Sequence, residues 1–245
     1  MNNLYNEKYR DLYRELLAEV KSMENDGATA FQFCGCGKDF IINPEKRLMV
    51  VGRAINGWDY NVNKCIKSEM LSAANPDVLK HMIDKYGSTS AFWRITQSVV
   101  QNLGLTGVDN WYDNLAWNNL YKIGPNGGGN PKERLCQTQF KLCNKILKHE
   151  INTLRPEYIL FVTGWWVNPF VTGVYNKKLG VAPDDKLPFK INFDTSEKDS
   201  IVIGTGAIKL DGHTSKIVIC HRPEARAGGE EKSKNEISEA FINLK

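Results

Sequence analysis

Long apolar runs and a secretion signal are both missing from this sequence. No apolar run approaches the roughly 20 residues that a membrane-spanning helix requires, so we expect no contact with a membrane. The opening stretch, MNNLYNEKYRDLYRELL, contains acidic side chains and lacks the apolar centre of a signal peptide. A cytoplasmic location follows as the default expectation.

A strong charge of one sign is also missing. The chain has 32 Lys and Arg residues against 28 Asp and Glu residues, for a net charge of +4. This small excess permits contact with phosphate but does not argue for it. Dedicated nucleic-acid binders more often show a basic block or a higher pI.

The six cysteines contain no CxxC pair, and Cys34 and Cys36 are the only two that lie close together in sequence. Their CxC spacing, with the others scattered, supplies no ligand set for zinc or an iron–sulfur cluster. We therefore expect free thiols and no cofactor. Elemental analysis of the purified protein should find neither zinc nor iron in stoichiometric amount.

What the sequence does contain is the pattern of one large α/β domain. The 245 residues suffice for a substantial core, and 42% of them are hydrophobic. Short apolar runs, most of them separated by helical patterns, predict four buried strands in one mainly parallel sheet with helices on both faces. These runs are Leu48–Val51, Leu115–Ile123, Tyr158–Val162 and Ile217–Cys220.

The helical patterns begin with an amphipathic stretch at Asn2–Met23. Further helices are predicted within Lys64–Tyr86, Ser90–Leu103, Lys132–Leu154, Trp165–Tyr175 and Ser233–Leu244. The segment from about 177 to 212 contains turns and short alternating runs, which favour an insertion of one or two antiparallel hairpins.

Polar groups stand at or near the ends of three predicted strands: the Gly52–Asp59 turn, Asn118 with Asn119, and His221. Asparagine is poorly suited to a strand interior. Each feature alone has an ordinary explanation as a connecting turn, an edge cap or a structural histidine. Together they favour a site, because the carboxyl ends of parallel strands converge on one crevice.

Four segments, in order, resemble motifs of the uracil-DNA glycosylase superfamily. They are VVGRAING, NNLYKIGP, LKHEINTLRPEYILFVTG and VICHRPEAR. The resemblance extends from about Arg47 to Leu244, without most of the 177–212 insertion. It implies a three-layer α/β/α sandwich around a four-stranded parallel sheet, with a flipped DNA base held at the strand ends.

The resemblance also implies roles for single residues. Asn119 would hydrogen-bond the Watson–Crick edge of a pyrimidine. His221 would donate to the base carbonyl as charge builds there. Trp58 or Tyr60 would stack on the base, and the base-binding turn would include Gly52 and Arg53.

The sequence departs from the family where water is positioned. Arg53 and Ala54 stand where the family has a carboxylate or an asparagine, and an arginine cannot act as a base. Asp59 and Asn56 are the nearest polar substitutes that could orient water. The last motif has His-Arg-Pro-Glu in place of His-Pro-Ser, and the cysteines of the iron–sulfur branch are not matched. We therefore expect weak or absent activity on uracil.

The leading hypothesis is a monomeric hydrolase that cleaves the N-glycosidic bond of a damaged or deaminated base in DNA. Such a protein would act in DNA repair by base excision. An inactive module that binds a nucleobase, nucleotide or nucleic acid through the same pocket is the alternative. A third hypothesis is an enzyme for a small anionic substrate, held by Arg53, Arg222 and Arg226. An α/β domain with an unrelated role is the plain alternative to all three.

Overall fold

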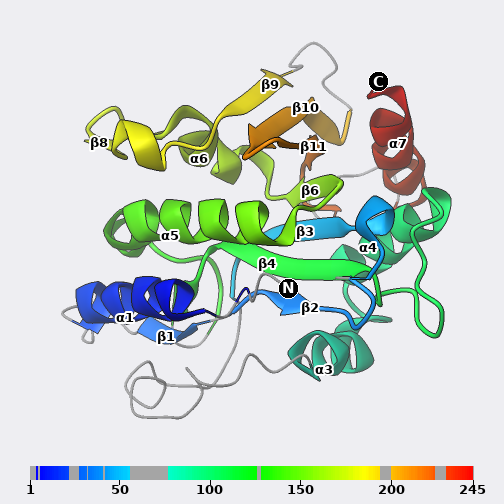
Figure 1. Ribbon diagram of the computed structural model, residues 1–245, viewed down its shortest axis with the longest axis horizontal. Helices are drawn as coiled ribbons and strands as arrows, with labels where there is room; N and C mark the ends of the chain where they lie inside the picture. Colours follow the sequence, from blue (N-terminus) through cyan, green and yellow to red (C-terminus); the bar gives the residue numbers. More distant parts are fainter. Residues whose placement is uncertain are drawn as a thin grey trace.

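The computed structural model describes residues 4, 6–21, 28–31, 33–40, 42–55, 77–125, 128–193, 200–223 and 230–244. Its largest sheet has seven strands in the order β2-β4-β3-β6-β11-β10-β9. Figure 1 shows them stacked one above another. Their bounds are β2 Gly35–Cys36, β3 Leu48–Ala54, β4 Leu115–Tyr121, β6 Tyr158–Val162, β9 Phe189–Phe193, β10 Val202–Leu210 and β11 His213–Cys220.

The four central strands, β4, β3, β6 and β11, are parallel to one another. The prediction that the four apolar runs lie in one parallel sheet is therefore confirmed, except that the second run leaves this sheet after Tyr121 and Ile123 pairs in a separate two-stranded sheet. The expected total of four strands is wrong. One antiparallel strand, β2, extends the sheet beyond β4, and two more, β10 and β9, extend it beyond β11.

Helices cover both faces of the sheet (Figure 1). Alternate residues of β3 enter two separate cores: Met49 and Val51 pack on one face, and Leu48 and Val50 pack on the other. The first core also receives α1 (Glu7–Lys21), α5 (Glu133–Leu154) and α6 (Asn168–Thr172). The second receives α3 (Asp77–Tyr86), α4 (Ala91–Asn102) and α7 (Glu230–Asn243).

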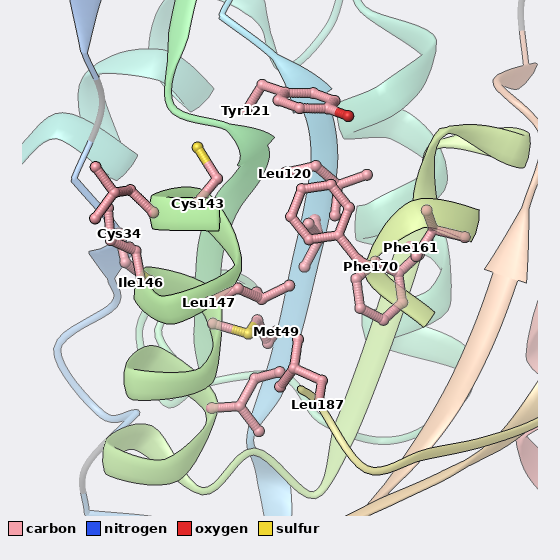
Figure 2. Close-up of a cluster of buried hydrophobic side chains, with 14 of the residues drawn as sticks. Cys34, Met49, Leu120, Tyr121, Cys143, Ile146, Leu147, Phe161, Phe170 and Leu187 are labelled. Carbon is pink, nitrogen blue, oxygen red and sulfur yellow. The ribbon is translucent and has the colours of Figure 1, made fainter. Parts of the chain in front are cut away.

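The core on the α5 face is shown in Figure 2. Cys143, Ile146 and Leu147 of α5 recur at helical spacing and face the sheet, where Met49 and Phe161 meet them. All five side chains are buried. Replacing such a large buried aliphatic side chain with alanine typically costs about 2–5 kcal/mol of stability.

The core on the α4 face contains aromatic pairs that join helices to the sheet. Trp93 of α4 packs edge-on against Trp117 of β4, with ring centroids 5.2 Å apart. Phe241 of α7 makes a similar contact with Tyr158 at 5.6 Å. These contacts set α4 and α7 on the sheet face opposite α5 and place the beginning of α4 beside the ends of β3 and β4.

The segment from 177 to 212 is only partly an insertion. A small hairpin joins β7 (Val174–Tyr175) to β8 (Leu179–Gly180). The strands β9 and β10 belong to the main sheet, and β10 pairs with β11 from Val202 to Leu210. One face of β9 is more exposed than the other, which explains the alternating runs in its sequence.

The predicted helices differ from the structure at their ends. The helices α4 and α5 agree with the predicted ranges to within one residue at each end, and α7 begins three residues earlier than predicted. The first predicted segment is helical over Glu7–Lys21. The pattern within Lys64–Tyr86 forms α3 at its carboxyl end, and the preceding residues 56–76 lie outside the described residues. The expected helix at Trp165–Tyr175 is a 3-10 turn, η4 (Gly164–Val167), followed by α6. The remaining two strands, β1 (Ala28–Phe31) and β5 (Ile123–Pro125), pair with each other.

Within these described ranges, no helix is both long enough and apolar enough to cross a membrane.

Candidate functional site

A cleft of about 240 Å³ opens at the carboxyl ends of the parallel strands. All four central strands contribute to it, directly or through the residues that follow them. The lining residues from the strands are Gly52, Arg53, Ala54, Ile55, Trp117, Asn119, Val162 and Arg222. Ser90, Phe92 and Trp93 at the beginning of α4 form another wall, with Met82, Gly129 and Asn130. The structure thus brings Gly52, Arg53 and Asn119 together, as the sequence predicted.

The side chain of Asn119 lies directly over Gly52. The two residues are paired neighbours on the parallel strands β3 and β4. A Cβ atom built on Gly52 would stand 2.3 Å from Asn119 Oδ1 and 3.7 Å from Cε2 of Phe92. Only glycine leaves room for the amide at this point, so Gly52 is a steric requirement for the position of Asn119.

The neighbouring Asn118 enters the opposite face of the sheet, because successive residues of a strand alternate. Its Nδ2 group donates to Glu150 Oε2 of α5, and its Oδ1 atom accepts from the backbone N–H of Asn119 at 2.7 Å. Asn118 Oδ1 also accepts from Lys122 Nζ. This asparagine is therefore fully engaged within the protein.

Lys122 and Glu150 form a buried ion pair, 3.0 Å apart, and both side chains are inaccessible to solvent. Lys122 Nζ also donates to the carbonyl oxygen of Asn119 at 2.8 Å. Together, Lys122 and Asn118 hold both the N–H and the carbonyl of Asn119. The ion pair consequently fixes the backbone that carries the cleft asparagine.

Two tyrosines of α1 complete this polar cluster. Tyr9 donates to Glu150 Oε1 at 2.7 Å, and its hydroxyl lies 3.5 Å from that of Tyr13. Burial raises the pKa of the Glu150 carboxyl, and the Lys122 ammonium and the hydrogen bonds from Tyr9 and Asn118 oppose that rise. Burial also raises the pKa of Tyr9 well above its usual range. The cluster thereby joins α1, β4 and α5 through groups with no access to water.

Arg53 and His221 meet beside Gly164, a residue with φ of +59° that follows β6. A Cβ atom there would stand 3.2 Å from Arg53 Nη2 and 3.4 Å from His221 Nδ1. Arg53 Nε donates to the carbonyl of Thr163 at 2.8 Å, and the guanidinium lies over the ring of Trp166 at 5.5 Å. The backbone N–H of His221 donates to Ile201.

His221 is placed less directly in the cleft than the sequence predicted. Arg222, the next residue, lines the cleft, whereas His221 is not among the described residues that do so. His221 lies beside Gly164, the same residue that Arg53 approaches. His221 is therefore near a residue of the cleft wall, Arg53, without lining the cleft itself.

Several predicted site residues lie outside the described residues, namely Asn56, Trp58, Asp59, Tyr60 and Arg226. In their place the structure shows cleft aromatics that the sequence reasoning did not assign to the site: Phe92, Trp93 and Trp117. The helical spacing of Phe92 and Trp93 indicated core packing. Phe92 and Trp93 are adjacent at the beginning of the helix and cannot both point in the same direction. This was the available signal that one of the two rings could face the strand ends.

The described cysteines are free, and all but Cys36 are buried. Burial raises the pKa of the Cys136 thiol to about 12 and that of Cys143 to about 12. In the part of the chain that the structure describes, no group of three or more His, Cys, Asp and Glu side chains is arranged to hold a metal ion.

No protein-family model matches the sequence, and a search of curated proteins found no match.

Proposed function

We propose that this protein is a divergent uracil-DNA-glycosylase-like protein that holds a base of DNA in the cleft and hydrolyses its N-glycosidic bond. The observation that carries the proposal is the amide of Asn119, which lies over Gly52 in a cleft walled by Phe92, Trp93 and Trp117. An amide both donates and accepts, so it matches the Watson–Crick edge of a pyrimidine. The aromatic walls offer surfaces for the faces of the ring.

The charges around the cleft suit the phosphates beside such a base. Arg53 and Arg222 both line it, and guanidinium groups bind phosphate oxygens through paired hydrogen bonds. Ser90, the residue that precedes α4, also lines it. The positive end of the helix dipole therefore adds to the attraction for an anion.

In the proposed reaction, a water oxygen bonds to C1′ of the sugar while the bond from C1′ to the base nitrogen breaks. The base leaves with the bonding electron pair and takes up a proton, and the second product is an abasic sugar. A donor near the base carbonyl would stabilise the charge that develops there. His221 is our candidate donor, because it lies beside Arg53 at the Gly164 turn.

Neither Arg53 nor Ala54 in the cleft supplies a group that could activate water. Arg53 remains protonated, and its Nε is engaged by Thr163. Ala54 has no polar side chain. Asn56 and Asp59 are our proposed residues for orienting water. The composition of the cleft around Arg53 and Ala54 also favours a second candidate function, namely recognition of the base without hydrolysis.

Single-turnover excision separates these two functions. Oligonucleotides containing uracil, hypoxanthine or an alkylated base are incubated with excess protein, and binding is measured on the same substrates by fluorescence anisotropy. The variants are Asn119→Ala and His221→Ala. The matched control is Asn192→Ala, since Asn192 is an exposed asparagine on the edge strand β9.

If the protein is a glycosylase, His221→Ala should slow excision by about 10² to 10³, the usual effect of losing one such donor. Asn119→Ala should weaken base selectivity, and Asn192→Ala should match the wild type. Binding that depends on Asn119 without excision would establish the recognition module. Absence of both excision and binding on every oligonucleotide would refute the proposal.

A further inference from the structure

A second cavity, of about 430 Å³, lies on the α5 face of the sheet, beside the β7–β8 hairpin. Four aromatic side chains line it: Tyr121, Trp165, Trp166 and Tyr175. We call this cavity the aromatic pocket. The Trp165 ring packs against that of Phe193 at 5.4 Å, and the residue is still 45% exposed, so part of the side chain faces solvent. Val174, next to Tyr175 on β7, is similarly exposed at 42%.

The walls of the aromatic pocket are held in place. Asn176 and Lys177 at the tip of the hairpin both have positive φ, at 47° and 59°. Asn176 Nδ2 donates to Glu133 Oε1, which fastens the hairpin to the first turn of α5. Tyr121 packs edge-on against Trp166 at 5.9 Å. A ligand would therefore meet a preformed surface, which lowers the entropy lost on binding.

Arg53 connects the aromatic pocket to the cleft. It lines the cleft, and its guanidinium lies over the ring of Trp166, which lines the aromatic pocket. A strand with one base in each cavity would place its connecting phosphate near this arginine.

Three lysines stand close in sequence to lining residues of the aromatic pocket. Lys132, Lys177 and Lys178 are exposed and lie next to, or within two residues of, the lining residues Glu133 and Asn176. Glu133 is the one acidic residue among the described lining residues, and it is engaged by Asn176. Cations around aromatic rings are the usual construction of a site for single-stranded nucleic acid.

We propose that the aromatic pocket holds an unpaired base of the same strand whose other base occupies the cleft. This inference rests on the proposed function of the cleft. It implies that the protein binds at least two unpaired bases of one strand. Stacking on an aromatic side chain accepts any base, so the aromatic pocket would add affinity for single strands and little sequence preference.

Calorimetric titration of two ligands tests the inference: thymidine 5′-monophosphate, and a single-stranded pentanucleotide of thymidine. Trp165→Ala should weaken binding of the pentanucleotide by about tenfold, the effect of one lost stacking contact. It should leave binding of the mononucleotide unchanged, whereas Asn119→Ala should weaken both. Trp165→Phe keeps an aromatic ring and should restore binding of the pentanucleotide. Val108→Ala, at a side chain that is 87% exposed, is the control.

The outcomes separate the two proposals. If Trp165→Ala leaves the pentanucleotide unaffected while Asn119→Ala weakens both ligands, the aromatic pocket is not a base site and the cleft still is. If Asn119→Ala affects neither ligand, or the wild type binds neither, the proposed function fails, and the inference drawn from it fails as well. Equal weakening of both ligands by Trp165→Ala would also overturn the inference, because it would place Trp165 in the cleft site.

Discussion

Asn118 and Asn119 are adjacent residues on β4 with the same side chain, and they have different surroundings. Asn118 faces α5, where Glu150, Lys122 and the backbone of Asn119 use its amide. Asn119 faces α4, where its amide lies over Gly52 in an open cleft. Both side chains are almost completely buried. The comparison shows that adjacent residues of one strand can enter different surroundings: Asn118 is hydrogen-bonded within the buried polar cluster, and Asn119 lines the cleft.

The largest expected effect on stability comes from breaking the buried ion pair on the α5 face of β4. Lys122→Met should lower the free energy of unfolding by about 3–5 kcal/mol, because it leaves the Glu150 carboxylate buried without its partner. Urea denaturation measures the loss. Lys145→Met removes one partner of a partly exposed pair with Asp185, which water can still reach, and should cost less than about 1 kcal/mol. Equal losses in the two variants would show that the buried pair contributes nothing special.

Substitution of Asn118 should mainly lower stability, and substitution of Asn119 should mainly weaken binding. Asn118→Ala removes hydrogen bonds from Glu150 and Lys122 in a dry environment, and we expect a loss of about 1–3 kcal/mol of stability. Asn119→Ala should cost less stability and should weaken base binding. Denaturation and nucleotide titration of both variants check this. The comparison breaks if Asn119→Ala proves the more destabilising of the two.

A substitution at Gly52 tests whether the position of the Asn119 amide in the cleft matters for binding. Gly52→Ala would place a Cβ atom 2.3 Å from Asn119 Oδ1 and force the amide away. We expect nucleotide affinity to fall by about tenfold, as for the loss of one or two hydrogen bonds. Gly180→Ala is the control, since the nearest atom to its Cβ would be 3.8 Å away. Unchanged affinity in Gly52→Ala would mean that Asn119 does not contact the ligand.

The smallest expected effect is a pH dependence of stability that arises from Glu150, in the buried cluster on the α5 face of β4. Because burial raises the pKa of the Glu150 carboxyl, the folded protein holds this proton to a higher pH than the unfolded chain does. The resulting stabilisation is complete below the usual pKa of 4.5 and is lost as the pH rises through the raised value.

Glu150→Gln removes this titration. The stability of the wild type relative to Glu150→Gln should therefore decline as the pH rises from 4.5, in urea denaturation at several pH values. Glu239→Gln, at an exposed position of α7, is the control for the substitution itself. A rising relative stability would contradict the direction that we assign to the pKa of Glu150.

The central strands could be predicted from the sequence because strands buried on both faces are short, continuous apolar runs. The edges could not be predicted in the same way. The strands β9 and β10 have the alternating pattern of a hairpin, and only the pairing of β10 with β11 shows that they extend the main sheet. A local pattern reports how a strand is buried and does not report which strand lies beside it.

Some residues of the candidate site could be predicted from local sequence patterns, and others could not. Gly52, Arg53 and Asn119 could be predicted because each stands at the end of a recognisable strand, and parallel strands end at the same edge. The ion pair of Lys122 with Glu150 joins residues 28 positions apart, and no local pattern connects them. Phe92 and Trp93 match the core side of a helix, so their place in the cleft required the packing of α4 against β4.

Arg53 touches both cavities, lining one and lying over Trp166 of the other. If both cavities bind ligand as proposed, a ligand that displaced the Trp166 ring would change its contact with the guanidinium, and the affinities of the two cavities would be linked. Thermodynamic linkage makes this coupling reciprocal, so each occupant changes the affinity for the other by the same factor. Under the proposed function, Arg53 would then make the response to one base depend on whether its neighbour is already bound.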